Sequence, residues 1–191
     1  MKNFIIDLGE WIIQDENYKD FKVKEVREFA LTIINNRLSK STQKIKSLQK
    51  VHLAEYCGTG EVVFKSQNVI VIDFGILVYC DYQKHRNVRI GDYLTGAFSI
   101  SIDPYHYFES LHQLKGIPPL IYSWRIRFII EDTYQFTKVD LPNGGFQLAR
   151  DEDSENLRFV RSTAVPSKNL FTNFMMSCAL QPKKPGYTFS N

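Results

Sequence analysis

The sequence predicts an α+β domain that is mostly β, in which an antiparallel sheet curves into a partly open barrel. Three observations support this fold class: a strictly alternating segment at residues 120–130, a run at 69–72 that is apolar on both faces, and helix signals at only about residues 104–115. No strand–helix–strand alternation runs through the chain, so parallel βαβ units are not expected. A barrel-like closure is economical because it leaves few exposed sheet edges.

The segment 120–130 gives the clearest strand signal. Its even positions are large and apolar, and they are Leu120, Tyr122, Trp124, Ile126, Phe128 and Ile130. A period of two is the period of a β-strand, so one face of this segment is expected to enter a core. The opposite face would then carry Arg125 and Arg127 outward.

The first third of the chain is expected to contain strands and one long loop. Residues 4–13 are apolar without a clear period and fit either a strand pair or a short helix, although Gly9 disfavours the helix. Residues 21–34 are rich in β-branched and aromatic side chains, which favours a strand. Residues 35–50 are basic with no acidic residue and are predicted to form an exposed loop, before a short strand at 51–56.

A β-hairpin is predicted at residues 61–65 and 69–80, closed by the polar residues 66–68. Because residues 69–72 are apolar at every position, they suit a central strand that is covered on both faces. Residues 57–60 contain two glycines and are expected to form a turn or a bulge.

One helix is predicted at about residues 104–115, after a strand region at 90–102. Asp103 could cap the free amide groups of the first turn, and Pro104 suits the first helical position, where its missing N–H had no partner. Gly116 could supply the left-handed residue that ends the helix.

The remainder of the chain is predicted to alternate between short strands and turns. Strands are expected at 146–148, 157–160 and 171–180, turns at 142–145 and 150–156, and a flexible tail at 182–191. With these elements the 191 residues are predicted to form one β-rich domain.

The composition limits the classes of protein that the chain can belong to. Apolar residues make up 43% of the sequence, which argues against disorder, and the net charge of +3 permits an anionic partner without demanding one. The three cysteines are an odd number at long spacings, so they predict neither a disulfide framework nor a metal site. The start of the chain does not resemble a signal peptide, and no apolar run is long enough to span a membrane, so a cytoplasmic protein without a membrane partner is expected.

No motif predicts catalysis, a bound metal or a cofactor, and the chain is therefore expected not to be an enzyme. Cys57 and His52 could act together only if the fold brought them into contact. His106 and His112 are six residues apart and would not share a helix face. The strongest enzymatic alternative is a carboxylate pair around Asp73, since an aspartate inside an apolar strand either points outward, is paired or is functional.

Binding of single-stranded nucleic acid is the leading alternative among binding functions. Arg125 and Arg127 would share a strand face, and Lys40, Lys44 and Lys46 would add positive charge from the loop at 35–50. OB-like barrels combine a basic groove of this kind with aromatic side chains on which bases stack. The small charge excess argues against this alternative.

Several segments resemble a family of bacterial immunity proteins, which protect a cell from polymorphic or contact-delivered toxins. They are distributed over most of the chain and are Asp7-Leu-Gly-Glu-Trp-Ile-Ile-Gln-Asp15, Asp20-Phe-Lys-Val-Lys24, Phe29-Ala-Leu31, Gly58-Thr-Gly-Glu-Val-Val-Phe64, Gly91-Asp-Tyr-Leu-Thr-Gly96, Asp103-Pro-Tyr-His-Tyr-Phe108, Pro118-Pro-Leu-Ile-Tyr-Ser-Trp-Arg-Ile126 and Arg150-Asp-Glu152. The resemblance implies a small intracellular protein that binds one cognate toxin tightly, blocks its active site or substrate, and has no catalytic activity.

A partner-binding surface is expected to combine anchoring residues with steering charge. Arg125 and Arg127 are the predicted anchors, and their joint replacement by alanine is expected to weaken partner binding without unfolding the chain. The predicted steering charges are Lys40, Lys44 and Lys46 in the basic segment and Asp151, Glu152, Asp153 and Glu155 in the acidic cluster. Inhibitors of nuclease toxins are often acidic whereas this chain is slightly basic, so either the toxin is not a nuclease or the acidic cluster forms the interface.

Overall fold

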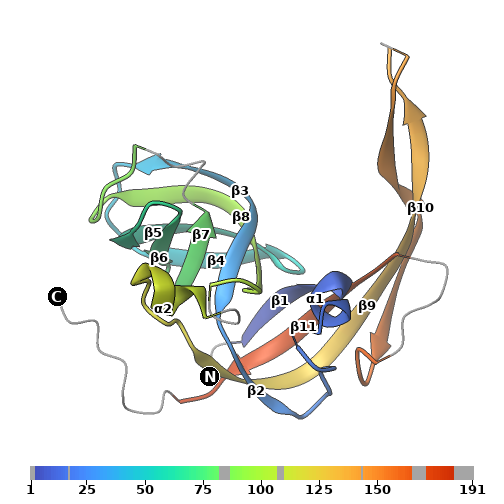
Figure 1. The fold of residues 1–191 in the computed structure, drawn as a ribbon, viewed down its shortest axis with the longest axis horizontal. Helices are drawn as coiled ribbons and strands as arrows, with labels where there is room; N and C mark the ends of the chain where they lie inside the picture. Colours follow the sequence, from blue (N-terminus) through green and yellow to red (C-terminus); the bar gives the residue numbers. More distant parts are fainter. Residues whose placement is uncertain are drawn as a thin grey trace.

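Strands dominate the computed structural model, which describes residues 3–16, 18–81, 87–106, 110–142, 144–164 and 171–182, without the side chains of 114, 115 and 152–154. The strands are β1 (Asn3–Gly9), β2 (Val26–Phe29), β3 (Leu31–Ser41), β4 (Ser47–His52), β5 (Glu55–Lys65), β6 (Val69–Asp73), β7 (Leu77–Asp81), β8 (Tyr93–Ile102), β9 (Tyr122–Asp140), β10 (Phe146–Val160) and β11 (Phe171–Leu180). The helices are α1 (Glu10–Gln14) and α2 (Leu111–Lys115) (Figure 1). Neither described helix is long and apolar enough to cross a membrane.

The strands form one sheet in the order β10-β9-β11-β1-β8-β3-β7-β6-β5-β4, with β2 paired to β9. An additional pairing of β5 with β8 closes β8, β3, β7, β6 and β5 into a ring of strands. Most pairings are antiparallel; β1 with β8 and β3 with β7 are parallel. The mostly β, α+β class that the sequence predicts is therefore confirmed, and the ring accounts for the expected curvature.

The doubly apolar run forms β6, and its two faces enter two different hydrophobic clusters. Ile70 and Ile72 belong to the main core, whereas Val69 and Val71 pack in a smaller cluster beside Tyr79 and the segment at 117–120. All four side chains of the run are fully buried. The prediction of a central strand covered on both faces is confirmed.

The start of β9 carries the alternation that the sequence shows, with Trp124 and Ile126 buried and Arg125 exposed. Trp124 donates its Nε1–H to the carbonyl oxygen of Phe29 at 3.2 Å, and their rings stack at 5.6 Å. The register of β9 against β11 then shifts, between the pairs Ser177–Phe128 and Cys178–Ile126. Because a bulge reverses which residues face inward, Ile129 is buried after the shift, and Glu131, Asp132 and Thr133 are buried further along the strand.

Three sequence predictions need correction in the first two thirds of the chain. The expected loop at 35–50 is mostly strand, because β3 extends through Ser41 along β8 and β4 begins at Ser47 along β5. Residues 57–60 lie inside β5 and not in a turn. The apolar segment at 4–13 forms both candidate structures in succession, a strand up to Gly9 and then α1.

The helix predicted at 104–115 is shorter in the structure, where α2 begins at Leu111, and residues 107–109 lie outside the described residues. Asp103 does not cap it; its carboxylate accepts a hydrogen bond from the His106 ring at 2.9 Å. Gly116 ends α2 in the left-handed conformation, as predicted.

The charged turn predicted at 150–156 is also wrong, because β10 runs through it as one long strand with an irregular register between Asp151 and Asn156. The tight turn at 142–145 joins β9 to β10, where the Leu141 N–H donates to the Gly145 carbonyl oxygen at 2.8 Å. The predicted tail at 182–191 lies outside the described residues from 183 onward.

Candidate functional site

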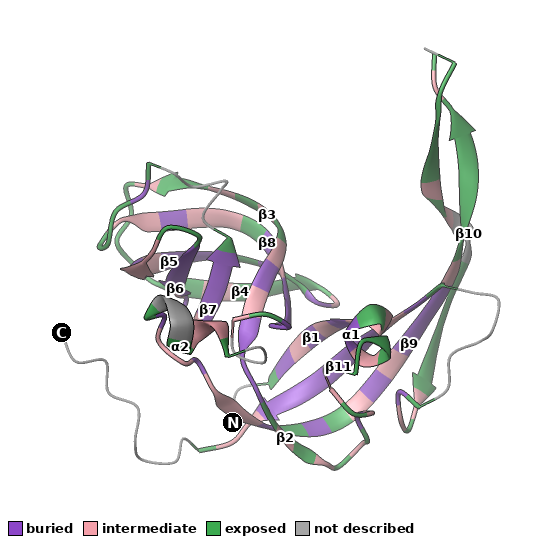
Figure 2. Cartoon of the chain, in the orientation of Figure 1, coloured by how far each residue is buried: buried purple, intermediate pink, exposed green. Residues whose placement is uncertain are grey.

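A two-stranded arm projects from the body of the molecule (Figure 1). Phe171, the first residue of β11, pairs with Tyr134. Past Tyr134, among the described residues, β9 pairs with β10 alone. We define the arm as residues 135–140 of β9 and 146–151 of β10. Nearly all residues of the arm are exposed, whereas the strands of the body contain many buried residues (Figure 2).

One face of the arm is apolar. Directly opposed residues in an antiparallel pair point to the same side, and three consecutive pairs on this side are Phe146 with Asp140, Leu148 with Lys138, and Arg150 with Phe136. Phe136, Phe146 and Leu148 are 38%, 59% and 61% exposed. We call this side the apolar face of the arm; the opposite side carries Gln135, Thr137, Val139, Gln147, Ala149 and Asp151.

Aromatic rings continue the apolar face at the base of the arm. The ring of Phe171, which is itself exposed, lies 4.6 Å from that of Phe136 and stacks with Tyr134 at 6.1 Å. The Lys138 ammonium lies 4.6 Å from the centre of the Phe146 ring. The face therefore presents a cluster of three rings at its base and a further ring, Phe146, near its tip, with charged residues paired opposite the apolar ones. Aromatic residues and arginine are enriched in protein interfaces.

Arg150 anchors the arm to the body. Its guanidinium donates to Asp132 and to Glu155, each at 2.7 Å, and lies 4.1 Å above the Tyr134 ring. Burial raises the pKa of Asp132, and the hydrogen bond from Arg150 opposes that rise. Since Asp132 is buried, the ion pair is partly shielded from water and can hold the base of the arm in one position.

A second carboxylate lies near Asp132 across the sheet. Asn173 pairs with Asp132 in the register of β11 with β9, and its side-chain amide donates to Asp7 on β1 at 2.5 Å. Burial raises the pKa of Asp7 to about 6, and the charge of Asp132 adds to this rise. On the other face of β9, the buried carboxylate of Glu131 pairs with Arg158.

The structure separates the residues that the sequence proposes for partner binding. Arg125 and Arg127 are exposed on β9, as expected. They precede Phe136 by about ten residues of extended chain, which corresponds to roughly 30–35 Å. Asp151 and Glu155 lie where the arm meets the body, and the side chains of Glu152 and Asp153 lie outside the described residues.

Of the three predicted lysines, Lys40 lies in β3, and Lys44 and Lys46 lie in the segment that joins β3 to β4. Two of the three are in ion pairs. Lys46 contacts Asp73 at 2.8 Å and Glu61 at 2.9 Å, and Lys40 contacts Asp92 at 2.8 Å. These hydrogen bonds raise the pKa of Lys46. Lys44 is exposed. Asp73, the residue proposed for a carboxylate pair, is thus held by a lysine together with Glu61.

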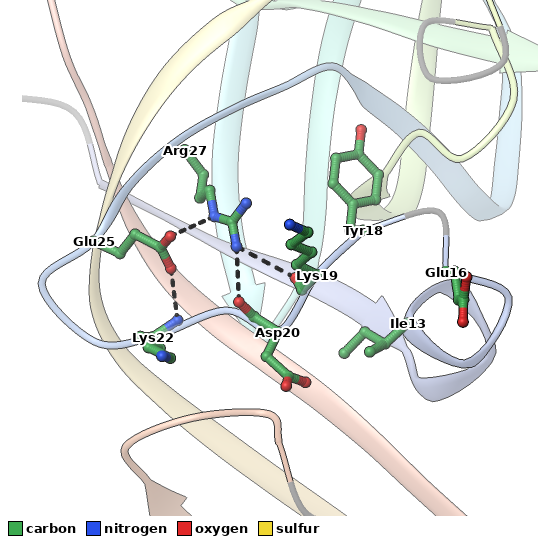
Figure 3. A pocket seen from close by; sticks show the side chains of 8 residues that line it. All are labelled: Ile13, Glu16, Tyr18, Lys19, Asp20, Lys22, Glu25 and Arg27. Atoms are coloured by element: carbon green, nitrogen blue, oxygen red, sulfur yellow. Dashed lines mark hydrogen bonds and ion pairs between the residues drawn. The ribbon is translucent and has the colours of Figure 1, made fainter.

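A hollow of about 660 Å³ lies between α1 and β2, and its lining comes from residues 13–27 (Figure 3). Arg27 donates to the carbonyl oxygen of Asp20 at 2.8 Å and pairs with Glu25 at 2.6 Å, while Glu25 also accepts from the Lys22 N–H. The polar groups that Figure 3 joins by dashed lines therefore stabilise the segment itself.

The cysteines and the possible metal ligands are the other candidates for chemistry. Cys57 is exposed, whereas Cys80 and Cys178 are buried. Among the described residues there is no group of three or more His, Cys, Asp and Glu side chains that could hold a metal ion.

Sequence reasoning missed the apolar face of the arm. The sequence did contain the strand spacing of this face. Phe136 and Lys138 are two residues apart, and so are Phe146 and Leu148, with the turn at 142–145 between the two pairs. What the sequence could not show is that β11 begins at Phe171, so that no third strand among the described residues pairs with this hairpin.

Searches of family models, curated proteins and solved structures found no match for this chain.

Proposed function

We propose that this chain is a non-catalytic binding protein that neutralises a cognate bacterial toxin, and that the toxin docks on the apolar face of the arm. The observation that carries the proposal is the exposure of Phe136, Phe146 and Leu148 together on one side of a projecting hairpin. Contiguous exposed apolar side chains of this kind mark interaction sites more often than ordinary surface.

The architecture of the arm supports a binding role. A two-stranded hairpin without a covering layer is marginally stable in water, because half of its side chains have nothing to pack against. A partner that covers the apolar face would supply the missing layer. In addition, β10 lies at the edge of the sheet that the described strands form, and an extended segment of a partner can pair with an edge strand.

The toxin as partner follows from the resemblance to immunity proteins, and Asp151 and Glu155 place acidic residues at the base of the arm, where Glu155 pairs with Arg150. The nucleic-acid alternative receives less support, since Lys40 and Lys46 are engaged by carboxylates on the ring. Binding to phosphates would have to displace these ion pairs.

The first test replaces Phe146 and Leu148 together with serine. We expect the affinity for the toxin to fall at least about 30-fold, because central apolar anchors contribute about 2 kcal/mol or more each. The thermal midpoint should change little, since both side chains are mostly exposed. The measurement is calorimetric titration with the stoichiometric partner isolated from the native host, together with rescue of growth in cells that express this partner.

Val139→Ser is the matched control, because Val139 is 40% exposed and lies on the opposite side of the same arm. It should keep both affinity and rescue. Equal losses in the control and in the double variant would remove the apolar face as the interface. Light scattering of the chain alone must also show the same mass before and after the double change; a dimer that dissociates would assign the face to a second copy.

Arg125→Ala combined with Arg127→Ala distinguishes the arm from the surface that the sequence proposes. A standard interface covers about 800 Å² on each partner, which is too small to include both this pair and the tip of the arm. We expect the double alanine variant to keep its affinity within about threefold. Strong loss here, with binding retained in the serine variant, would move the interface to the start of β9.

A further inference from the structure

A separate cavity of about 460 Å³ lies between the ring and the sheet that carries the arm. Its floor includes three residues in adjacent strands, because Asp7 on β1 pairs with Ser101 on β8, and Ser101 pairs with Thr32 on β3. The Ser101 hydroxyl donates to the carbonyl oxygen of Asp7 at 3.0 Å. The volume falls within the range of roughly 300–1,000 Å³ that is usual for small-molecule sites.

Two aromatic rings line the cavity from separate elements. Trp11 comes from α1 and Tyr105 from the turn that follows β8, and their rings stack with centroids 5.9 Å apart and planes 29° apart. Both side chains are exposed although they line a cavity, so they lie at its entrance. Stacked aromatic faces present negative electrostatic potential to a bound group.

The charged groups that line the cavity are acidic or paired. Asp7 and Asp81 contribute carboxylates, and the His106 ring is hydrogen-bonded to Asp103 at 2.9 Å. No lysine or arginine occurs among the described residues that line it. The described part of the lining is therefore acidic, although the net charge of the chain is +3.

We propose that this cavity binds an ammonium or guanidinium group, which would contact the Trp11 and Tyr105 rings and the Asp7 carboxylate. The inference does not rest on the proposed function, because it concerns other residues and a different chemistry.

The carboxylate of Asp7 can accept a ligand N–H in addition to the amide of Asn173, because a carboxylate offers about four acceptor positions. A cation would also offset the electrostatic cost of holding this carboxylate away from water. The ring faces add a cation–π contribution that strengthens when the site excludes solvent.

The cation could be a free amine or a lysine or arginine side chain of a partner protein, since both present the same group. The two sources differ in what must enter the cavity with it. A side chain brings a peptide backbone that has to pass Trp11 and Tyr105, whereas a free amine does not.

Titration with butylguanidinium chloride at pH 7.5 tests the proposal, with butylurea as the neutral probe of the same shape. Fluorescence can report binding, because Trp11 is exposed and the other tryptophan, Trp124, is fully buried. We expect saturation by butylguanidinium on the order of 1 mM, and at least tenfold weaker binding of butylurea. Sodium chloride at matched ionic strength corrects for screening.

Asp7→Asn is the test variant, because asparagine can still accept the hydrogen bond from Asn173 but carries no charge. It should weaken butylguanidinium binding about tenfold or more, whereas Asp15→Asn, at an exposed position beyond α1, should not. Thermal unfolding of each variant checks that it is folded. Equal affinity for the two probes, or unchanged binding in Asp7→Asn, would overturn the proposal.

A capped Gly-Ser-Lys-Ser-Gly peptide and butylammonium chloride then identify the source. Binding of the peptide at least as tight as that of butylammonium would indicate a side chain from a protein partner. Binding of butylammonium with a peptide at least tenfold weaker would indicate a free amine.

Discussion

Asp7→Asn is expected to stabilise the protein at pH 7, by about 1–3 kcal/mol. The pKa of the Asp7 carboxyl rises from 3.8 to about 6 in the folded chain, chiefly because burial disfavours the charged form. Each pKa unit corresponds to about 1.4 kcal/mol, and the partial exposure of the residue reduces the effect below the full value. Asparagine removes the buried charge and keeps the bond from Asn173.

The stabilisation should depend on pH in a definite direction. Well below pH 3.8 the carboxyl is protonated in both the folded and the unfolded chain, so that Asp7 imposes no electrostatic cost. As the pH rises from about 3 to about 6, the unfolded chain loses this proton more readily than the folded chain does. Stability contributed by the raised pKa is therefore lost across this interval and stays lost above it.

Urea unfolding of the wild-type chain and of Asp7→Asn at about pH 3 and pH 7 measures the effect. The difference between the two free energies of unfolding should be small near pH 3 and larger at pH 7, with Asp15→Asn showing no such change. A variant that is less stable than the wild type at both pH values would mean that the Asp7 carboxylate supports the fold. Such a result would contradict the direction of its pKa shift.

Gly96→Ala is expected to destabilise the protein by about 3 kcal/mol or more, which corresponds to a thermal midpoint lower by roughly 6–12 °C. Gly96 has a φ of +153°, and a Cβ there would lie 2.1 Å from the carbonyl oxygen of Arg37. The residue pairs with Leu38 on one side and Gly58 on the other, at a point where β8 joins β3 and β5. The neighbouring atom belongs to backbone, so the clash cannot be relieved by a change of rotamer.

Gly91→Ala is the matched control for Gly96→Ala. Gly91 also has a positive φ, of +86°, but nothing lies within 4 Å of a Cβ added there. Gly91→Ala should lower the free energy of unfolding by only about 1 kcal/mol, because alanine adopts a positive φ less readily than glycine does. Equal thermal midpoints for the two variants in scanning calorimetry would contradict a requirement for close packing at Gly96.

The sequence predicted the elements whose burial follows from the pattern of neighbouring residues. The run at 69–72 and the alternation from Trp124 to Ile126 needed only local periodicity. The strands at 35–50 could not be predicted in this way, because their side chains are polar and their pairing with β8 and β5 involves distant residues. The bulge in β9 reversed an alternation that the sequence shows as continuous up to Ile130.

The candidate sites divide along the same line. Outward placement of Arg125 and Arg127 followed from strand alternation alone. The Asp7 environment depends on β1 lying between β11 and β8, so that Asn173 and Ser101 approach it from the two neighbouring strands, both distant in sequence. The predicted helix start at Asp103 was wrong because α2 begins only at Leu111, and the Asp103 carboxylate bonds to the His106 ring.

The position of β1 between β8 and β11 sets an order of events during translation. β1 meets β8 through one registered pair, Asp7 with Ser101, but meets β11 along its whole length, from Asn3 with Ala179 to Gly9 with Asn173. Ribosomes need roughly 10–30 s to add the residues between β1 and β11. The buried side chains of β1, which are Phe4, Ile6 and Leu8, therefore lack β11 even after the ring strands have been synthesised. During this interval a nascent chain would most need a chaperone.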